Sequence, residues 1–164
     1  MKKTVLVVDD DASVRKSLSK VLRDAGYDVV LAKDGREAVE RFNPHQTDLL
    51  LLDIGLPIKN GWETFERITR EDPVLPIIVI TGHTEQYDMA VASGVGALME
   101  KPLDAPELLE TVEDLLAETK EARLRRLCGH RQDVLSSSAR FLQELREHSS
   151  SPYRCTLSSS ADDS

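Results

Sequence analysis

Side chains able to take part in acid, hydroxyl and cation chemistry follow four short apolar segments of the chain. Asp9 and Asp10 follow the first of them, Asp53 closes a run of four leucines, Thr81 follows a third segment and Lys101 a fourth. Carboxylates that lie close together repel one another, and a hard divalent cation such as Mg2+ relieves that repulsion through oxygen ligands. A lysine and a hydroxyl beside the cation suit a phosphoryl group, with one carboxylate as its nucleophile.

The apolar segments have the length and character of buried strands, and helical periodicity separates them. Asp34 to Glu37 and Asp104 to Glu107 have the spacing of capping boxes that open two of the helices. The expected strands are 5–8, 27–32, 48–53, 76–80 and 94–100, and the expected helices are centred on 14–25, 37–42, 62–68, 84–93 and 107–116. Five strands that alternate with five helices predict an α/β fold with a doubly wound parallel sheet.

Parallel strands present their carboxyl ends at one edge of the sheet, where open α/β sheets form ligand sites. The residues that follow the strands are therefore predicted to converge on one pocket. Taken alone, the three acids at 9–11 fit a helix N-terminus, Thr81 an ordinary strand end and Lys101 a solvated side chain. Asp53 is harder to explain structurally, because a charged group seldom closes a buried leucine run unless it is paired.

At these residues the chain resembles the receiver domain of two-component response regulators, over about residues 3–119. The matching motifs are Val7-Val8-Asp9-Asp10-Asp11, Leu51-Leu52-Asp53-Ile54-Gly55-Leu56-Pro57, Asn60-Gly61, Val79-Ile80-Thr81-Gly82 and Lys101-Pro102-Leu103. The resemblance implies a flavodoxin-like sheet of order 2-1-3-4-5. It also implies a phosphoryl-accepting switch in a phosphorelay rather than an enzyme with a separate substrate, one that supports its own phosphotransfer and autodephosphorylation.

The resemblance assigns a role to each residue of the predicted pocket. Asp53 would accept the phosphoryl group from a sensor histidine kinase or a phosphotransfer protein, and Lys101 and Thr81 would bind phosphoryl oxygens. Asp9, Asp10 and Asp53 would hold Mg2+, with the backbone carbonyl of Gly55 as a further ligand. The family also usually has a cis peptide before the proline that matches Pro102.

Leu98 departs from the family pattern. The residue three before the lysine is commonly Tyr or Phe, whose ring moves inward as the Thr or Ser of the site moves. Leucine has no hydroxyl or ring edge, so the propagation of a change from Thr81 to the surface is predicted to differ here.

A second hypothesis comes from another class of protein. Asp9-x-Asp11 after an apolar strand also fits the nucleophile motif of haloacid-dehalogenase-like phosphatases, in which Thr81 and Lys101 could serve as later strand-end residues. Such an enzyme needs a further acidic motif after another strand, whereas Glu113 and Asp114 lie inside a helical pattern. The position of the acyl phosphate, on Asp53 or on Asp9, separates the two hypotheses.

Composition divides the chain near residue 120. Residues 1–119 carry 13 Lys/Arg and 23 Asp/Glu, whereas 120–164 carry 8 and 6. We expect a receiver domain at 1–119, an amphipathic helical extension at 120–148 and a Ser-rich disordered tail at 149–164. The basic residues of the extension are interpreted as a solvated helix face.

Charge and hydropathy also predict the partners and the location. The net charge of -8 argues against a nucleic-acid partner for the whole chain, and no segment approaches the roughly 20 apolar residues of a membrane span. We therefore expect a cytoplasmic protein with no membrane partner. Its output would be contact with a downstream protein through the face of the fourth helix, fifth strand and fifth helix, or homodimerisation.

Overall fold

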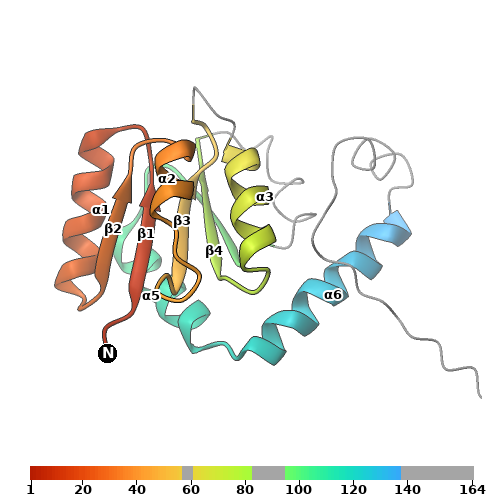
Figure 1. Cartoon of the computed structure of the whole chain (residues 1–164). Coiled ribbons are helices and arrows are strands. Elements are labelled where there is room, and N and C mark those ends of the chain that lie inside the picture. The colour runs from red at the N-terminus through yellow and green to blue at the C-terminus, as the bar shows by residue number, and fades with distance from the viewer. Residues whose placement is uncertain (57–60, 83–94, 138–164) are drawn as a thin grey trace, which may run out of the picture.

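A computed structural model describes residues 1–56, 61–82 and 95–137, with side chains up to residue 128. Its centre is one parallel sheet in the order β2-β1-β3-β4-β5, which confirms the predicted fold class (Figure 1). The strands are β1 Thr4–Val8, β2 Asp28–Ala32, β3 Leu49–Asp53, β4 Ile77–Thr81 and β5 Ala97–Glu100. All four strand pairings are parallel.

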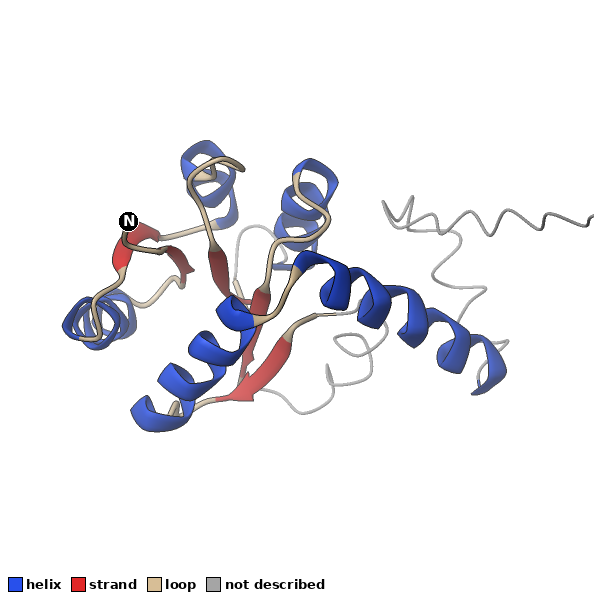
Figure 2. Ribbon diagram, turned by 90° about the horizontal axis from the view of Figure 1, so that it is seen from below, coloured by secondary structure: helices blue, strands red, loops and turns tan. Residues whose placement is uncertain are grey.

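The leucine strand β3 lies in the middle of this sheet and is buried on both faces. Leu50 and Leu52 belong to one hydrophobic core, and Leu49 and Leu51 belong to a second core on the opposite face. The first core is covered by α2 Gly35–Arg41 and α3 Gly61–Glu71, and the second by α1 Ala12–Asp24 and α5 Ala105–Ala117 (Figure 2). Helices cover both faces of the central strands, so a ligand site is expected at the carboxyl ends of these strands.

Three helices begin at aspartates whose carboxylates accept backbone N–H bonds. Asp11 caps α1 and Asp34 caps α2, while Asp104 caps α5 and accepts a bond from the Glu107 N–H at 3.0 Å. The predicted box at Asp34 is modified, because the Glu37 carboxylate accepts from Lys33 N rather than from Asp34 N. These caps set where α1, α2 and α5 start after the strand-end loops.

The helix expected at 84–93 and the tail expected at 149–164 lie outside the described residues. Of the extension expected at 120–148, the described part forms helix α6, Lys120–Ser137, and Thr119 caps it by accepting from the Ala122 N–H at 3.1 Å. The helix starts beneath the amino-terminal ends of the strands and projects beyond the body (Figure 1). Among the described helices, none is both long and apolar enough to cross a membrane.

The interpretation of the basic stretch as a solvated face was wrong for part of α6. Arg123 is only 7% exposed, because its guanidinium turns inward onto backbone carbonyls of the body. Arg126 is half-buried, whereas Arg125 is exposed as expected. Leu127 is buried and Leu124 is 45% exposed, so the start of α6 has an inner and an outer side.

Candidate phosphoryl-acceptor and metal site

The structure brings the predicted site residues to one edge of the sheet. Asp9 follows β1, Asp53 ends β3, Thr81 ends β4 and Lys101 follows β5. Asp53 lies opposite Ile80 in the β3–β4 register, so the buried Thr81 is the next residue toward the same edge. The Lys101 backbone N–H donates to the Thr81 carbonyl at 2.9 Å, which fixes the start of the Lys101 loop against β4.

Lys101 is the centre of the site. Its Nζ lies 2.9 Å from Asp9 Oδ2 and 2.8 Å from Asp53 Oδ2, so one ammonium group bridges two carboxylates. Both carboxylate side chains are nearly inaccessible, at 0% and 6% exposure, while that of Lys101 is 30% exposed. The lysine therefore compensates two buried negative charges and still reaches the solvent side of the pocket.

The remaining oxygens of the two aspartates accept backbone hydrogen bonds. Asp9 Oδ1 accepts from the Asp11 N–H and Asp53 Oδ1 accepts from the Gly55 N–H, both at 2.8 Å. Each carboxylate is thus held at one oxygen by the loop that follows it and at the other by Lys101. This arrangement orients both groups before any ligand arrives, which is the preorganisation that phosphoryl transfer needs.

Burial and pairing act in opposite directions on the ionisation of these groups. Burial raises the pKa of the Asp9 carboxyl and outweighs the lowering effect of the Lys101 and Asp11 hydrogen bonds. Burial alone would lower the pKa of Lys101, but its hydrogen bonds to Asp53 and Asp9 raise that pKa overall. Lys101 therefore stays protonated at neutral pH, and the raised pKa of Asp9 reflects chiefly its burial, with the charge of Asp53 as a smaller contribution.

Three carboxylates lie close enough to share a cation. Asp9, Asp10 and Asp53 each offer an oxygen, and these oxygens all lie within 4.8 Å of one another. Asp10 is exposed, so the cluster opens to solvent on one side, where water can complete a coordination sphere. An all-oxygen donor set that combines carboxylates and water fits Mg2+. Gly55, the predicted carbonyl ligand, lies two residues after Asp53 and is exposed.

Sequence reasoning missed Arg15, which holds the loop that carries two of the acids. The Arg15 Nη1 group donates to the Asp9 carbonyl at 2.7 Å and to the Asp10 carbonyl at 3.0 Å. The side chain comes from the first turns of α1 and reaches back over its own N-terminus. No short motif predicts a side chain that donates to backbone carbonyls, so its only sequence signal was a basic residue within two turns of the acids.

A close backbone approach beside Asp53 also requires a glycine at the start of α3. A Cβ atom at Gly61 would lie 2.3 Å from Ile54 Cα and 2.8 Å from the Asp53 carbonyl oxygen. A side chain at this position would push α3 away from the end of β3. The Asn60-Gly61 motif therefore has a steric reason in this chain.

The geometry does not support the phosphatase hypothesis. Asp11, the second acid of that motif, is exposed, and its carboxylate accepts from Ser13 N at 2.7 Å and Val14 N at 3.3 Å as the cap of α1. Glu113 and Asp114 lie inside α5, as the helical pattern predicted, and no described strand precedes them after Lys101. Asp11 is thus a capping residue, and the acidic motif that a phosphatase would need is missing from the described part of the chain.

Two further expectations concern β5 and the loop after it. The peptide between Lys101 and Pro102 is cis, as the resemblance implied. Leu98 pairs with Val79 in the β4–β5 register and packs half-buried against the core under α2 and α3. The position of the usual aromatic residue is thus filled by a packed aliphatic side chain.

Comparison with known proteins agrees with this geometry. Residues 5–113 match the response regulator receiver domain family. The DNA-binding response regulator MtrA of Mycobacterium tuberculosis is 36% identical over 138 residues, which cover 83% of this chain and 57% of that protein. The alkaline phosphatase synthesis transcriptional regulatory protein PhoP of Bacillus subtilis is 33% identical over 124 residues, covering 74% and 52%. The chain therefore spans about half the length of these relatives.

Solved structures show the same fold. The CheY-like receiver domain protein from Methanospirillum hungatei is 30% identical with a TM-score of 0.68, covering 74% of this chain and 98% of that one. The response regulator TrrA from Thermotoga maritima, solved in complex with Mg2+ and BeF, is 30% identical with a TM-score of 0.64, covering 69% and 98%. With the family match over most of the folded body, this chain belongs to the response regulator receiver domain family of two-component systems.

Proposed function

We propose that Asp53 is the phosphoryl acceptor of this receiver domain and that phosphorylation is its signalling event. The observation that carries the proposal is the placement of Lys101 Nζ between Asp53 Oδ2 and Asp9 Oδ2 within a cluster of three carboxylates. A carboxylate oxygen of Asp53 attacks the phosphorus of the donor and forms a new O–P bond. The bond from phosphorus to the donor's leaving group breaks, and that group leaves with the electron pair.

The residues around Asp53 have separate tasks in this reaction. Asp9, Asp10 and the Gly55 carbonyl, together with Asp53, would hold Mg2+, which supplies charge neutralisation to the phosphoryl oxygens. Lys101 moves part of its hydrogen bonding from the carboxylates to a phosphoryl oxygen. Thr81, buried at the end of β4, donates its hydroxyl to another.

Phosphorylation converts the Asp53 carboxylate, which carries one negative charge, into an acyl phosphate that carries nearly two, so the site gains about one negative charge beside the carboxylates of Asp9 and Asp10. The redistribution of Lys101 and Thr81 toward these charges moves the ends of β4 and β5. The downstream protein reads the resulting change on β5 and α5 and on the helix expected at 84–93, which lies outside the described residues. Hydrolysis of the acyl phosphate in the same pocket returns the domain to its first state, so the chain acts as a switch and not as an enzyme with a separate substrate.

The donor is a sensor histidine kinase or a phosphotransfer protein. Such a donor carries the phosphoryl group on a histidine nitrogen, and this nitrogen is the leaving group when Asp53 attacks. We place this exchange in the cytoplasm. The net charge of -8 argues against nucleic acid as a direct partner. That expectation stays a prediction, since MtrA, whose name describes a DNA-binding regulator, is a relative.

The experiment is phosphorylation of the full chain by a small acyl phosphate with Mg2+, followed by intact mass and peptide mapping. We expect the wild-type protein to gain one phosphoryl group on Asp53 and Asp53→Asn to gain none. Asp24→Asn, at an exposed carboxylate that ends α1 at the opposite edge of the sheet, is the matched control and should be labelled like wild type. Undiminished labelling of Asp53→Asn would refute the assignment, and label on Asp9 would favour the phosphatase chemistry.

A further inference from the structure

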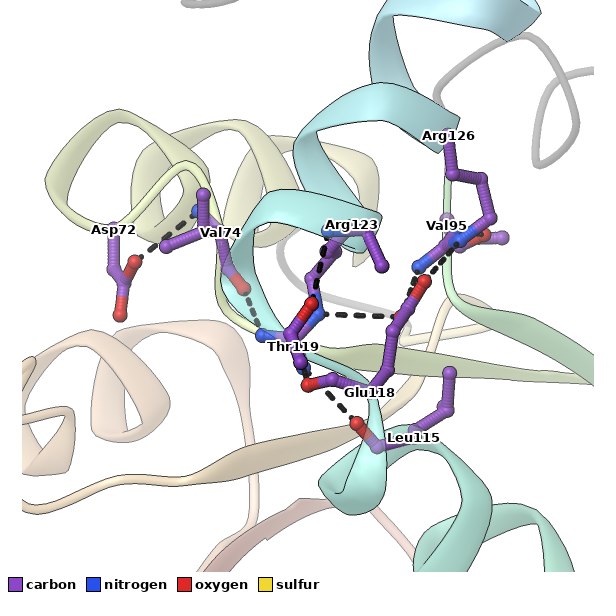
Figure 3. Close-up of polar contacts among 9 residues, drawn as sticks. Asp72, Val74, Val95, Leu115, Glu118, Thr119, Arg123 and Arg126 are labelled. Atoms are coloured by element: carbon purple, nitrogen blue, oxygen red, sulfur yellow. Dashed lines mark hydrogen bonds and ion pairs between the residues drawn. The ribbon is translucent and has the colours of Figure 1, made fainter.

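The first turns of α6 are fastened to the body by two arginines that share Glu118 (Figure 3). We call Glu118, Arg123 and Arg126 the clasp. It lies at the amino-terminal ends of β4 and β5, whereas the phosphoryl site lies at their carboxyl ends. The clasp and the phosphoryl site therefore occupy opposite edges of one sheet.

Arg123 is the buried anchor of the clasp. Its Nη1 donates to the Val74 carbonyl at 2.5 Å, and its Nη2 donates to the Leu115 carbonyl at 3.0 Å and the Glu118 carbonyl at 3.1 Å. Val74 precedes β4 and Leu115 belongs to the last turns of α5. Arg123 therefore satisfies backbone acceptors of two segments that are far apart in the sequence, and it joins α6 to both.

Arg126 adds a link that Arg123 does not make. Its Nε and Nη2 contact the two carboxylate oxygens of Glu118 at 3.2 and 3.0 Å, and its Nη1 donates to the Val95 carbonyl at 3.2 Å. Val95 leads directly into β5. Next to it, a Cβ atom on Gly96 would lie 3.0 Å from both the Ile77 carbonyl oxygen and Leu115 Cδ1, so this entry to the strand is tightly packed.

Strand β5 connects this link to the phosphoryl site. Val95 lies two residues before the four-residue strand Ala97–Glu100 and Lys101 directly after it, and the residues of the strand pair with β4 throughout. Paired strands move as units, so a displacement of the Lys101 end of β5 reaches its Val95 end. Lys101 is the group that changes partners when a phosphoryl group is added to Asp53.

We propose that the clasp makes α6 an output element of this receiver, released from the body when Asp53 is phosphorylated. The inference rests on the proposed function and names the element that it regulates. In the described arrangement the Lys101 ammonium group bonds to the carboxylates of Asp9 and Asp53, and the clasp is closed. Transfer of Lys101 to a phosphoryl oxygen shifts β5, lengthens the bond from Arg126 to the Val95 carbonyl and weakens the docking of α6.

Docking and phosphorylation must then influence each other equally. If a ligand at the phosphoryl site raises the equilibrium constant for opening of the clasp by some factor, then opening of the clasp raises the affinity for that ligand by the same factor. This reciprocity supplies a second measurement that does not depend on α6 remaining docked.

The test is hydrogen exchange of the backbone amides of residues 120–127 in the full chain, with and without acyl phosphate and Mg2+. We expect exchange to become faster by about fivefold or more on phosphorylation of the wild-type protein. Arg126→Met should abolish this response, while Arg125→Met, at an exposed neighbour on the same helix, should retain it. Glu118→Gln keeps the link to Val95 and should retain it too.

The second measurement is the affinity for beryllofluoride in the presence of Mg2+. Arg126→Met should bind this phosphoryl mimic more tightly than Arg125→Met, by about the factor seen in the exchange experiment. Equal affinities, or unchanged or slower exchange in a wild-type sample that intact mass shows to be phosphorylated, would overturn the coupling. A wild-type protein that gains no phosphoryl group would instead overturn the proposed function, and the coupling with it.

Discussion

Lys101 Nζ lies 2.8 Å from Asp53 Oδ2, although 48 positions separate the two residues in the sequence. The same ammonium group lies 2.9 Å from Asp9 Oδ2. A single cation therefore holds together the ends of β1, β3 and β5. This contact stabilises the fold at the pocket. It also means that negative charge added to the pocket has to change the hydrogen-bond partners of Lys101.

Lys101→Met should destabilise the protein and increase the stabilisation that Mg2+ gives it against unfolding. Removal of the ammonium leaves two buried carboxylates uncompensated, and we expect the free energy of unfolding to fall by about 1–3 kcal/mol. The value is below that of a fully buried pair because the lysine side chain is 30% exposed. Added Mg2+ should then stabilise Lys101→Met more than wild type, since the cation replaces the missing charge.

Urea denaturation with and without MgCl2 measures both effects of Lys101→Met. Lys20→Met is the control, because Lys20 pairs with Asp24 on the surface with the two side chains 78% and 66% exposed. Its unfolding free energy should stay close to that of wild type, because an exposed ion pair contributes little to stability. Equal Mg2+ responses in wild type and Lys101→Met would contradict the compensating role of Lys101.

Arg15→Met should weaken Mg2+ binding, although it removes a positive charge from the neighbourhood of a cation site. The charge effect alone would tighten binding, but loss of the bonds to the Asp9 and Asp10 carbonyls frees the loop that carries these ligands. Residues that orient metal ligands typically change affinity about 10-fold or more when they are removed.

Calorimetric titration of MgCl2 into the Arg15→Met variant tests this role. Lys16→Met loses the same charge on the neighbouring exposed position of α1 and should bind Mg2+ as wild type does or slightly more tightly. Matching affinities for Arg15→Met and Lys16→Met would show that Arg15 does not position the ligands.

Gly61→Ala should destabilise the fold by about 1–3 kcal/mol, because the new methyl group would overlap the backbone of Ile54 and Asp53. Gly82→Ala is the matched control, since a Cβ atom there meets nothing within 4 Å. Its unfolding free energy should stay within about 1 kcal/mol of wild type. Chemical denaturation of the two variants measures the difference, and similar values for both would argue against a steric requirement at position 61.

Glu118 should make the stability of the docked α6 dependent on pH in the acidic range. Hydrogen bonds from Arg126 lower the pKa of the Glu118 carboxyl below its ordinary value of 4.5, with smaller contributions from the charge of Arg126 and from Arg123. A carboxylate with a depressed pKa stabilises the folded state at pH values above 4.5, and the effect disappears as the pH falls through the folded-state pKa.

The comparison of wild type with Glu118→Gln isolates this effect. At pH 7 we expect wild type to be more stable by about 0.5–1 kcal/mol after solvent screening. The difference should shrink as the pH falls below 4.5 and vanish below the folded-state pKa of Glu118. Thermal unfolding of both proteins across this range provides the measurement. A difference that persists at low pH would mean that the carboxylate charge does not contribute.

The sequence alone determined the fold, and it predicted which residues gather at the carboxyl ends of the strands. Alternating apolar segments and helical periodicity predicted the parallel sheet, and the rule that parallel strands end at one edge brought Asp9, Asp53, Thr81 and Lys101 together. These predictions succeeded because each depends on local patterns, namely strand length, capping aspartates and the residue that follows each strand.

Only the tertiary structure decided the roles of Arg15, Gly61, Arg123 and Arg126. Three of them are arginines that donate to backbone carbonyls, which every residue offers, so no side-chain pattern in the sequence identifies the acceptor. The basic stretch of α6 therefore looked solvated until its helix was placed against Val74 and Val95. The acceptors of a long, flexible arginine side chain are decided by the tertiary structure, because only the fold determines which backbone carbonyls lie within its reach.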